Sequence, residues 1–350
     1  MKEPIYIEKY RIYDLFHNDE KKIVIIMPSP NNDKEECEIY KLEEGKEKGF
    51  KLHKCGHGHT YVYILEEERE YENTIRLKIN GKEIETRVNK YPCYEDKILM
   101  STMVYKEDKY IRQWINYHKR LGVEHFIIYD NANMNDKLSY KSVGKETNLS
   151  ELLKDLINEG IVLLINWPYK KRESREKISG QACQQNHSIN GFKRSKYIGL
   201  FDIDEYVNMQ KDNNINKLID RIIKEEKLKT EDIGSFVLKM KPFLNVKEKR
   251  EDGYEFLKIF TCGKVIDSTS KRCKNFIIPK NVNNYCVHTI TNGKDNYGIK
   301  KETAYFNHYL FLNKGKELKS IRNKDMFNTI MKGEFDKDDN TILRHTKGLF

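Results

Sequence analysis

The 350-residue sequence lacks long apolar runs and any CxxC pair of cysteines. With a mean hydropathy of −0.79, the missing apolar runs exclude a transmembrane helix. The first residues are charged throughout and contain no apolar signal-peptide core, so we expect no secretory leader. The seven scattered cysteines are odd in number, which argues against a disulfide framework and favours a reducing compartment. We therefore expect a cytoplasmic protein, with a viral or bacterial setting open.

Sequence motifs that bind phosphate through glycine-rich loops are also missing. Gly56 and Gly58 are followed by no third glycine and no helix pattern, which excludes a dinucleotide fingerprint, and no P-loop lysine motif occurs. The sequence instead contains 34% charged and 11% aromatic residues. Disordered chains are usually poor in aromatics, so the composition predicts a globular protein with a heavily charged surface. The length predicts two domains, or one large domain with an appendage.

Charge is distributed unevenly along the chain. Residues 1–96 contain 17 basic and 21 acidic side chains, a net charge of −4, whereas residues 97–350 contain 47 and 33, a net charge of +14. This difference favours a domain boundary near residue 96. The positive part indicates an anionic partner, namely a nucleotide diphosphate, a nucleic acid or an acidic surface, although a solvated basic face explains the charge about equally well.

Residues 1–96 have the pattern of short β-strands. The apolar run 21–30 ends in two prolines, and 60–68 and 74–88 alternate between apolar and polar side chains. Asn80-Gly81 lies between two alternating arms, which is a strong signal for a two-residue hairpin. We predict a small β-rich accessory domain here. Its function does not follow from the sequence.

From residue 97 onward, strand-length apolar runs alternate with helical patterns. The predicted strands cover 98–105, 123–130, 161–168 and 196–207. The predicted helices cover 108–122, with Asp108 as N-cap and Gly122 as its end, then 148–160 and 178–195. Such alternation predicts an α/β fold whose mostly parallel sheet is covered on both faces. Ligands bind such sheets outside the carboxyl ends of the strands.

The clearest chemical signal is the acidic run Asp202-Ile203-Asp204-Glu205, directly after a predicted strand. Like charges this close raise each other's pKa unless a cation lies between them. In an extended segment Asp202 and Asp204 face the same side, and their oxygens suit Mg²⁺ or Mn²⁺. A helix cap with solvated neighbours explains many chance DxD matches. The position after a buried strand favours the metal site here.

Histidines and a basic run provide further candidates. A divalent site with two carboxylates is incomplete, and His308 or His288, late in the chain, could complete it, although a lone histidine is more often structural. Lys271, Arg272 and Lys274 could contact a diphosphate; an exposed, charged strand end explains them about equally well.

A separate tract contains His53, Cys55, His57 and His59 within seven residues. Zinc sites normally have a second ligand pair further along the chain. We therefore predict a flexible loop here, and structural or adventitious zinc remains the alternative.

Several motifs, in order, resemble glycosyltransferase family 92 and its family 2-like relatives. They are Tyr105-Lys106-Glu107-Asp108, Tyr129-Asp130-Asn131, Gln181 with Asn186-His187, Phe201 through Tyr206, Lys271 through Pro279 with Val287-His288, and Asn307-His308-Tyr309. The resemblance covers roughly 97–312 and leaves 313–350 as a charged, partly helical tail. It implies a GT-A fold, in which a Rossmann-like nucleotide-binding half precedes an acceptor half.

The resemblance also implies an activity and a site. The expected reaction is transfer, with inversion, of a hexosyl group from a nucleotide-diphosphate sugar, with a UDP-sugar as the expected donor, to a glycan, glycoconjugate or other hydroxyl acceptor. Mn²⁺ or Mg²⁺ would bridge the diphosphate, held by Asp202 and Asp204 with His308 or, as second choice, His288. The nucleotide and diphosphate pocket would be lined by Tyr105, Lys106, Glu107, Asp130, Asn131, Gln181, Lys271 and Lys274.

Two questions stay open at this level. An inverting enzyme needs a carboxylate base, and Glu251 or Asp252 in the acceptor half is our candidate, although a solvated charged loop explains both. The alternative function is a nucleic-acid-binding or metal-dependent nucleic-acid-processing protein, suggested by the charge of +14. Because no known nucleic-acid-binding motif occurs, we expect no nucleic-acid partner. The sequence does not predict the oligomeric state.

Overall fold

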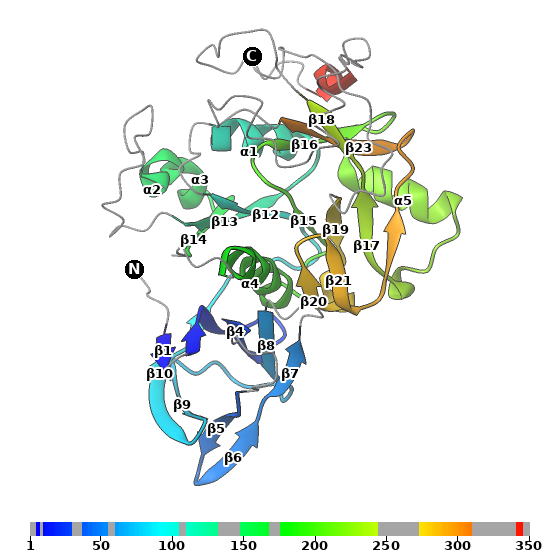
Figure 1. Ribbon diagram of the computed structural model, residues 1–350. Helices are drawn as coiled ribbons and strands as arrows, with labels where there is room; N and C mark the ends of the chain where they lie inside the picture. Colours follow the sequence, from blue (N-terminus) through cyan, green and yellow to red (C-terminus); the bar gives the residue numbers. More distant parts are fainter. Residues whose placement is uncertain are drawn as a thin grey trace.

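The computed structural model describes residues 5–7, 10–29, 37–54, 60–104, 110–131, 148–167, 176–243, 273–309 and 341–345. Its strands form two groups of sheets, and a long helix lies between the groups (Figure 1). Within these residues no helix is long and apolar enough to cross a bilayer. None of the five described cysteines is in a disulfide.

The described residues up to Lys90 form three β-sheets. One has two strands (β1-β2), one has the order β11-β3-β4-β8-β7, and one has the order β10-β9-β5-β6. The strands are β1 (Ile5–Ile7), β2 (Tyr10–Ile12), β3 (Asp14–His17), β4 (Ile23–Pro28), β5 (Ile39–Glu43), β6 (Lys46–Gly49), β7 (Lys51–Lys54), β8 (Thr60–Leu65), β9 (Thr74–Ile79), β10 (Lys82–Arg87) and β11 (Asn89–Lys90). The predicted hairpin is confirmed: Asn80 and Gly81 have φ of 47° and 84°, the conformation of a type I′ turn.

The largest sheet has seven strands in the order β14-β13-β12-β15-β19-β17-β22. Six of them run in one direction and β19 alone is antiparallel to its neighbours. The strands are β12 (Ile98–Val104), β13 (His125–Asp130), β14 (Val162–Asn166), β15 (Tyr197–Leu200), β17 (Ile233–Leu238), β19 (Lys274–Ile277) and β22 (Asp295–Gly298). The prediction of a mixed α/β fold is confirmed.

Two smaller sheets and five α-helices complete the described part of the chain. The sheets are β16-β23-β18, made of β16 (Glu205–Met209), β18 (Met240–Phe243) and β23 (Ala304–Tyr309), and the ribbon β20 (Val282–Cys286) with β21 (Thr289–Gly293). The helices are α1 (Ile111–Arg120), α2 (Leu149–Leu152), α3 (Lys154–Asn158), α4 (Glu176–Gly191) and α5 (Ile215–Glu225). Short 3₁₀ turns occur at Thr230–Asp232, Pro279–Asn281 and Thr341–His345.

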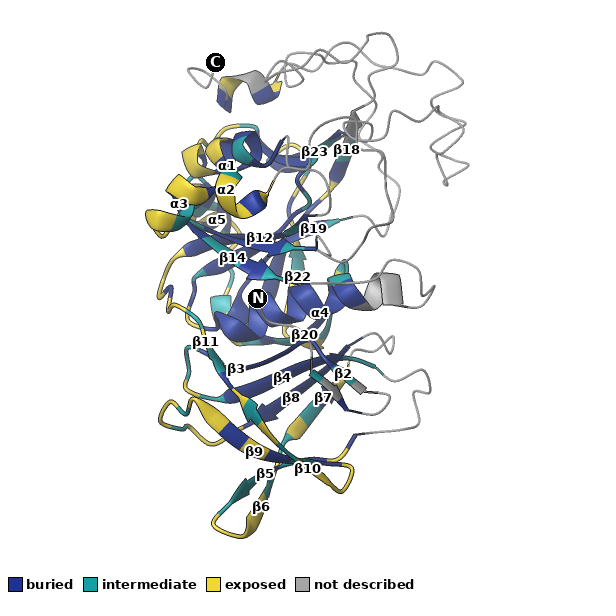
Figure 2. Cartoon of the chain, turned by 90° about the vertical axis from the view of Figure 1, so that its left-hand side faces the viewer, coloured by how far each residue is buried: buried dark blue, intermediate teal, exposed yellow. Residues whose placement is uncertain are grey.

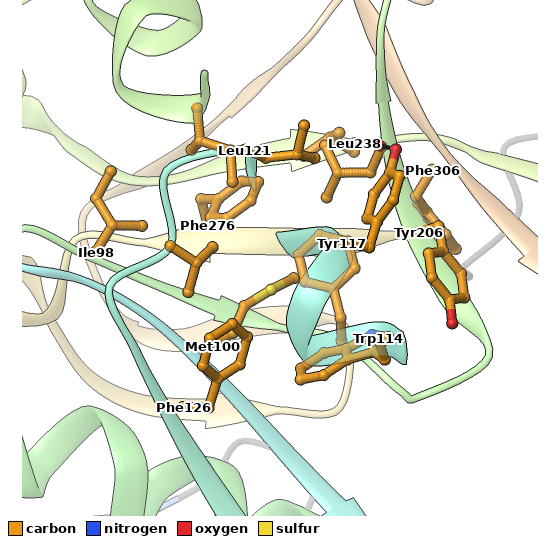
Figure 3. Close-up of a cluster of buried hydrophobic side chains, with 14 of the residues drawn as sticks. Ile98, Met100, Trp114, Tyr117, Leu121, Phe126, Tyr206, Leu238, Phe276 and Phe306 are labelled. Carbon is orange, nitrogen blue, oxygen red and sulfur yellow. Dashed lines mark hydrogen bonds between the residues drawn. The ribbon is translucent and has the colours of Figure 1, made fainter. Parts of the chain in front are cut away.

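The seven-stranded sheet is covered by a different layer on each face. Alternate residues of a strand point to opposite faces, so Ile98 and Met100 of β12 pack with Trp114 of α1, whereas Leu99 packs with α4 and the N-terminal sheets. Figure 3 shows the first of these cores, in which Trp114, Tyr117 and Phe126 are grouped between helix and sheet. The two faces of one sheet therefore face two separate cores.

Several predicted boundaries differ from those observed. The predicted strand 196–207 is in fact two strands, β15 and β16, which belong to different sheets and are joined by a turn. Helix α1 begins at Ile111, and its N-cap residue Tyr110 makes no side-chain capping hydrogen bond. Asp108 lies outside the described residues. The predicted helix 148–160 is divided into α2 and α3. Gly122 and Gly160 end their helices with φ of 92° and 70°, as predicted.

The division of the chain near residue 96 stays a prediction. Strand β11 ends at Lys90 and β12 begins at Ile98, and no described strand pair joins the sheets before this point to those after it. One core nevertheless contains residues from both sides, for example Phe16 and Leu99. At the other end, Ile342 is fully buried in the core of α1 and the large sheet, so the predicted tail contributes to packing there.

Candidate active site

The acidic run lies where the central strand β15 leaves the large sheet. Strand β15 ends at Leu200, and β16 begins at Glu205 in the small sheet. The register aligns Val104, Asp130 and Asn166, the last residues of β12, β13 and β14, along the same edge. The acidic side chains are therefore at the carboxyl ends of parallel strands, which is where ligands bind in sheets of this type.

A tight turn sets the directions of the acidic side chains. The Glu205 N–H donates to the Asp202 carbonyl at 3.0 Å, and the Asp202 N–H donates to Glu205 Oε2 at 2.8 Å. Because residues 201–204 form no strand, the expectation that Asp202 and Asp204 share one face of an extended segment is wrong. Asp202 is directed to Lys274, and Asp204 is directed to His308.

Asp204, Glu205 and His308 form the one group of possible metal ligands found among the described residues. One donor atom from each lies within 4.8 Å of the other two. His308 Nε2 is 3.4 Å from Asp204 Oδ2, and His308 Nδ1 is 3.9 Å from Glu205 Oε1. Asp202 and His288, which we also expected as ligands, are not in this group. Asp202 lies beside the group, and its role as a metal ligand stays a prediction.

The positions of these three residues follow from backbone pairing. Glu205 and His308 are direct cross-strand partners in the antiparallel pair β16–β23, so their side chains lie on the same face. The Tyr309 N–H donates to the Asp204 carbonyl at 2.9 Å. The Trp114 indole donates to the Glu205 carbonyl at 3.0 Å, which connects the group to α1. The arrangement is therefore fixed by secondary structure and by a buried side chain.

Lys274, the first residue of β19, forms ion pairs with two of the acids. Its ammonium is 2.7 Å from Asp202 Oδ2 and 2.8 Å from Glu205 Oε2, and its side chain is only 5% exposed. Burial lowers the pKa of Lys274, but the two carboxylates outweigh burial and raise its pKa overall. Lys274 was expected at a diphosphate. In this structure it forms ion pairs with carboxylates, and its contact with a diphosphate stays a prediction.

The remaining charges leave the site short of positive charge. Burial raises the pKa of Glu205 to about 7, with Lys274 opposing and the charge of Asp202 adding to the rise. Partial burial acts to raise the pKa of Asp202, but the charge of Lys274 and its hydrogen bond outweigh this and lower the pKa overall. Burial lowers the pKa of His308, and the charge of Asp204 outweighs burial and raises it. Three carboxylates thus face one ammonium and one imidazole, which is a donor set that fits a divalent cation.

Two further expected residues lie beside this group. Gln181 of α4 donates from Nε2 to Asp202 Oδ1 at 3.5 Å, a long contact. His288 donates from Nδ1 to the Cys273 carbonyl at 2.9 Å, and its charge contributes to the lowered pKa of Asp202. Gln181 and His288 are therefore neighbours of Asp202.

The roles of the other expected residues stay predictions. Asp130 and Asn131 lie at the end of β13, which is separated from β15 by β12, and their role in nucleotide binding stays a prediction. Tyr105, Lys106, Glu107, Lys271, Glu251 and Asp252 lie outside the described residues. His53 is buried on β7, while the rest of its tract, 55–59, is also outside them.

One possible metal ligand, and one buried tyrosine whose pKa the site affects, were not among the expected residues. Glu205 is the third acid of the run, so the same sequence signal could have found it. Tyr285 of β20 is fully buried, its hydroxyl has no hydrogen-bond partner, and burial together with nearby charges, including those of Glu205 and Asp202, raises its pKa. Its sequence context, Asn284-Tyr285-Cys286, contains no comparable signal.

Fold and site together define the class: a mixed α/β protein with an acidic, histidine-containing site at the carboxyl ends of its parallel strands. Comparison with protein-family models identifies the family within this class. The family model of glycosyltransferase family 92 matches residues 99–345, and the chain belongs to that family.

Individual relatives match over shorter stretches. A glycosyltransferase family 92 protein of Arabidopsis thaliana is 26% identical over 130 residues, which are 37% of this chain and 19% of the relative. One of Ricinus communis is 29% identical over 105 residues, 30% of this chain and 15% of the relative. The chain thus matches less than a fifth of either relative's length.

A solved structure of UDP-glucose pyrophosphorylase complexed with UDP-glucose matches 62% of this chain and 90% of its own, at 11% identity. Its TM-score of 0.23 is too low to support a conclusion about the fold.

Proposed function

We propose that this chain is a metal-dependent hexosyltransferase. It transfers a sugar from a nucleotide-diphosphate sugar, with a UDP-sugar as the expected donor, to a hydroxyl group of a glycan or glycoconjugate, with inversion. The observation that carries the proposal is the coincidence of family membership over residues 99–345 with the ligand group Asp204, Glu205 and His308. The GT-A fold is part of the proposal, supported by the mostly parallel sheet and by the position of the group at its edge.

The proposed roles follow from the contacts of each residue. Asp204, Glu205 and His308 would hold Mn²⁺ or Mg²⁺, which when bound supplies positive charge for the departing diphosphate. Lys274 keeps Asp202 and Glu205 oriented through its two short ion pairs. Asp202 is 44% exposed and can accept a hydrogen bond from a substrate hydroxyl.

Titration calorimetry with UDP, with and without MnCl₂, tests the proposal. We expect the wild type to bind UDP measurably only with Mn²⁺, and Asp204→Asn to lose this binding at least tenfold because a ligand oxygen and its charge are removed. Glu226→Gln is the matched control, since Glu226 is a surface acid paired with Lys300 away from the group. Transfer from a UDP-sugar, measured as UDP release, should follow the same order.

Two results would contradict the proposal. One is UDP binding that does not depend on Mn²⁺. The other is an Asp204→Asn variant that binds UDP with Mn²⁺ as tightly as the Glu226→Gln control.

A further inference from the structure

Helix α4 is buried from Ala182 to Gly191, although many of its side chains there are polar. In its described part, six polar residues are each 5% exposed or less: Gln184, Gln185, Asn186, His187, Ser188 and Asn190. A helix at a protein surface normally buries one apolar stripe and exposes its polar face. Here α4 packs against β12 and β15 of the large sheet on one side and against β4 and β8 of the N-terminal sheet on the other. Figure 2 shows α4 as a buried layer between the two sheets.

A buried carboxylate of the N-terminal sheet bonds directly to α4. Asp14 of β3 is 3% exposed. Its Oδ1 accepts from the Leu15 N–H at 2.7 Å and from Asn89 Nδ2 at 2.6 Å. Its Oδ2 accepts from the Tyr91 hydroxyl at 2.5 Å and from His187 Nε2 at 2.9 Å. Four donors therefore converge on one carboxylate, and His187 of α4 is one of them.

The hydrogen-bonded chain continues through α4 into the large sheet. With Nε2–H donated to Asp14, the Nδ1 of His187 accepts from the Tyr129 hydroxyl at 2.6 Å. Tyr129 belongs to β13, and its oxygen is 3.0 Å from Ser188 Oγ. Ser188 is in turn 2.6 Å from Ser101 of β12. The chain thus joins β3, α4, β13 and β12, and every member is buried.

The same helix carries Gln181, which donates to Asp202 beside the ligand group. Gln181 lies six residues before His187, roughly 9 Å along the helix axis. A shift of α4 along its axis, or a rotation about it, would therefore move Gln181 relative to Asp202. A buried donor that loses its acceptor is costly, so the bonds to Asp14 oppose such shifts.

We propose that Asp14 is a positioning residue. By holding His187, the N-terminal sheet fixes α4 and sets Gln181 against Asp202, so that the N-terminal region is an integral layer of the transferase. The effect of Asp14 on catalysis rests on the proposed function, whereas its effect on the position of α4 does not.

A double-mutant cycle on the full chain tests the link to the site. We expect Asp14→Asn, which keeps the side-chain volume, to lower kcat about tenfold because Gln181 is displaced, with the KM for the acceptor changed less than about twofold. Asp14 and Gln181 share no contact, so independent effects would multiply. If Asp14 acts through Gln181, the double variant Asp14→Asn/Gln181→Ala will be no slower than the slower single variant. Multiplying losses in kcat would overturn the proposal.

Hydrogen exchange of the same proteins provides a readout that does not need transferase activity. We expect the amides of residues 180–191 to exchange about tenfold faster in Asp14→Asn than in the wild type. Glu47→Gln is the control, because Glu47 is an exposed acid of the same region that pairs with Lys78. Unchanged exchange in α4 overturns the positioning role. Faster exchange together with a wild type that transfers no sugar would overturn the proposed function alone.

A milder variant covers the case in which Asp14→Asn does not fold. Tyr91→Phe removes one of the four donors to Asp14 and leaves the ring packing in place. We expect it to raise the exchange rate of the α4 amides about threefold. We also expect it to lower kcat, as Asp14→Asn does. No change in either quantity would overturn the proposal.

Discussion

The stability of this protein should depend on pH through one buried imidazole, that of His118. Its ring lies in α1 among Trp114, Tyr117, Phe201 and Tyr206 and is fully buried. Nδ1–H donates to the Trp114 carbonyl at 2.9 Å, and Nε2 accepts from the Val207 N–H at 3.4 Å. Burial lowers the pKa of His118 from 6.5 to about 3, and the bond to the carbonyl opposes this only in part. The folded state therefore contains a neutral His118.

The sign and size of the effect follow from this pKa. Below pH 6.5 the unfolded chain binds a proton at His118 that the folded protein does not, so stability falls as the pH falls. Between pH 8 and pH 5 the loss attributable to His118 is about 2 kcal/mol, and it grows to about 4 kcal/mol by pH 3.

Urea unfolding at pH 8 and pH 5 measures this loss. His118→Gln is the comparison, because it retains polar atoms but cannot take up the proton. Other titrating groups act in both proteins, so the wild type should lose about 2 kcal/mol more than the variant over this interval. Equal losses in the two proteins would refute the assignment of a neutral, buried imidazole.

Two further predictions concern charge and backbone shape. Lys274→Met should reduce the free energy of unfolding by about 3 kcal/mol, measured in urea with EDTA, because two carboxylates lose their buried partner. Adding Glu205→Gln should restore part of that loss, and a further loss would contradict the reasoning. Gly122→Ala should cost more stability than Gly160→Ala in thermal unfolding. Both have positive φ, but a Cβ at Gly122 would lie 2.2 Å from the Asn214 side chain that caps α5, whereas a Cβ at Gly160 meets open space. Equal losses of stability in the two variants would contradict this prediction, because they would show that the Asn214 side chain moves aside without cost.

Local patterns predicted the elements whose causes are local. Asn80-Gly81 formed its hairpin because both residues tolerate a positive φ. Gly122 and Gly160 ended helices for the same reason. The alternation of apolar runs and helical patterns after residue 97 correctly indicated an α/β fold, and the acidic run was found at the edge of its sheet.

Contacts between segments far apart in the sequence determine the features that the sequence patterns did not predict. The segment 196–207 has the composition of one strand, but the bond from the Tyr309 N–H to Asp204 draws its second half into another sheet. Glu205 meets His308 only through the register of β16 and β23, and Lys274 reaches Glu205 only because β19 lies beside β15. The burial of α4 depends on a sheet made from residues before 90, and the polar sequence of the helix gave no sign of that contact.

The wide spacing of the site residues along the chain has a consequence for biosynthesis. Glu205 pairs with a lysine and a histidine that follow it at positions 274 and 308. At ribosomal speeds of 5–20 residues per second, roughly 5–20 s pass between translation of Glu205 and of His308. Until Lys274 is translated the nascent acidic turn has neither partner, and from then until His308 is translated it still lacks the imidazole. Its carboxylates therefore stay in water until the last strands emerge, and this part of the molecule matures late.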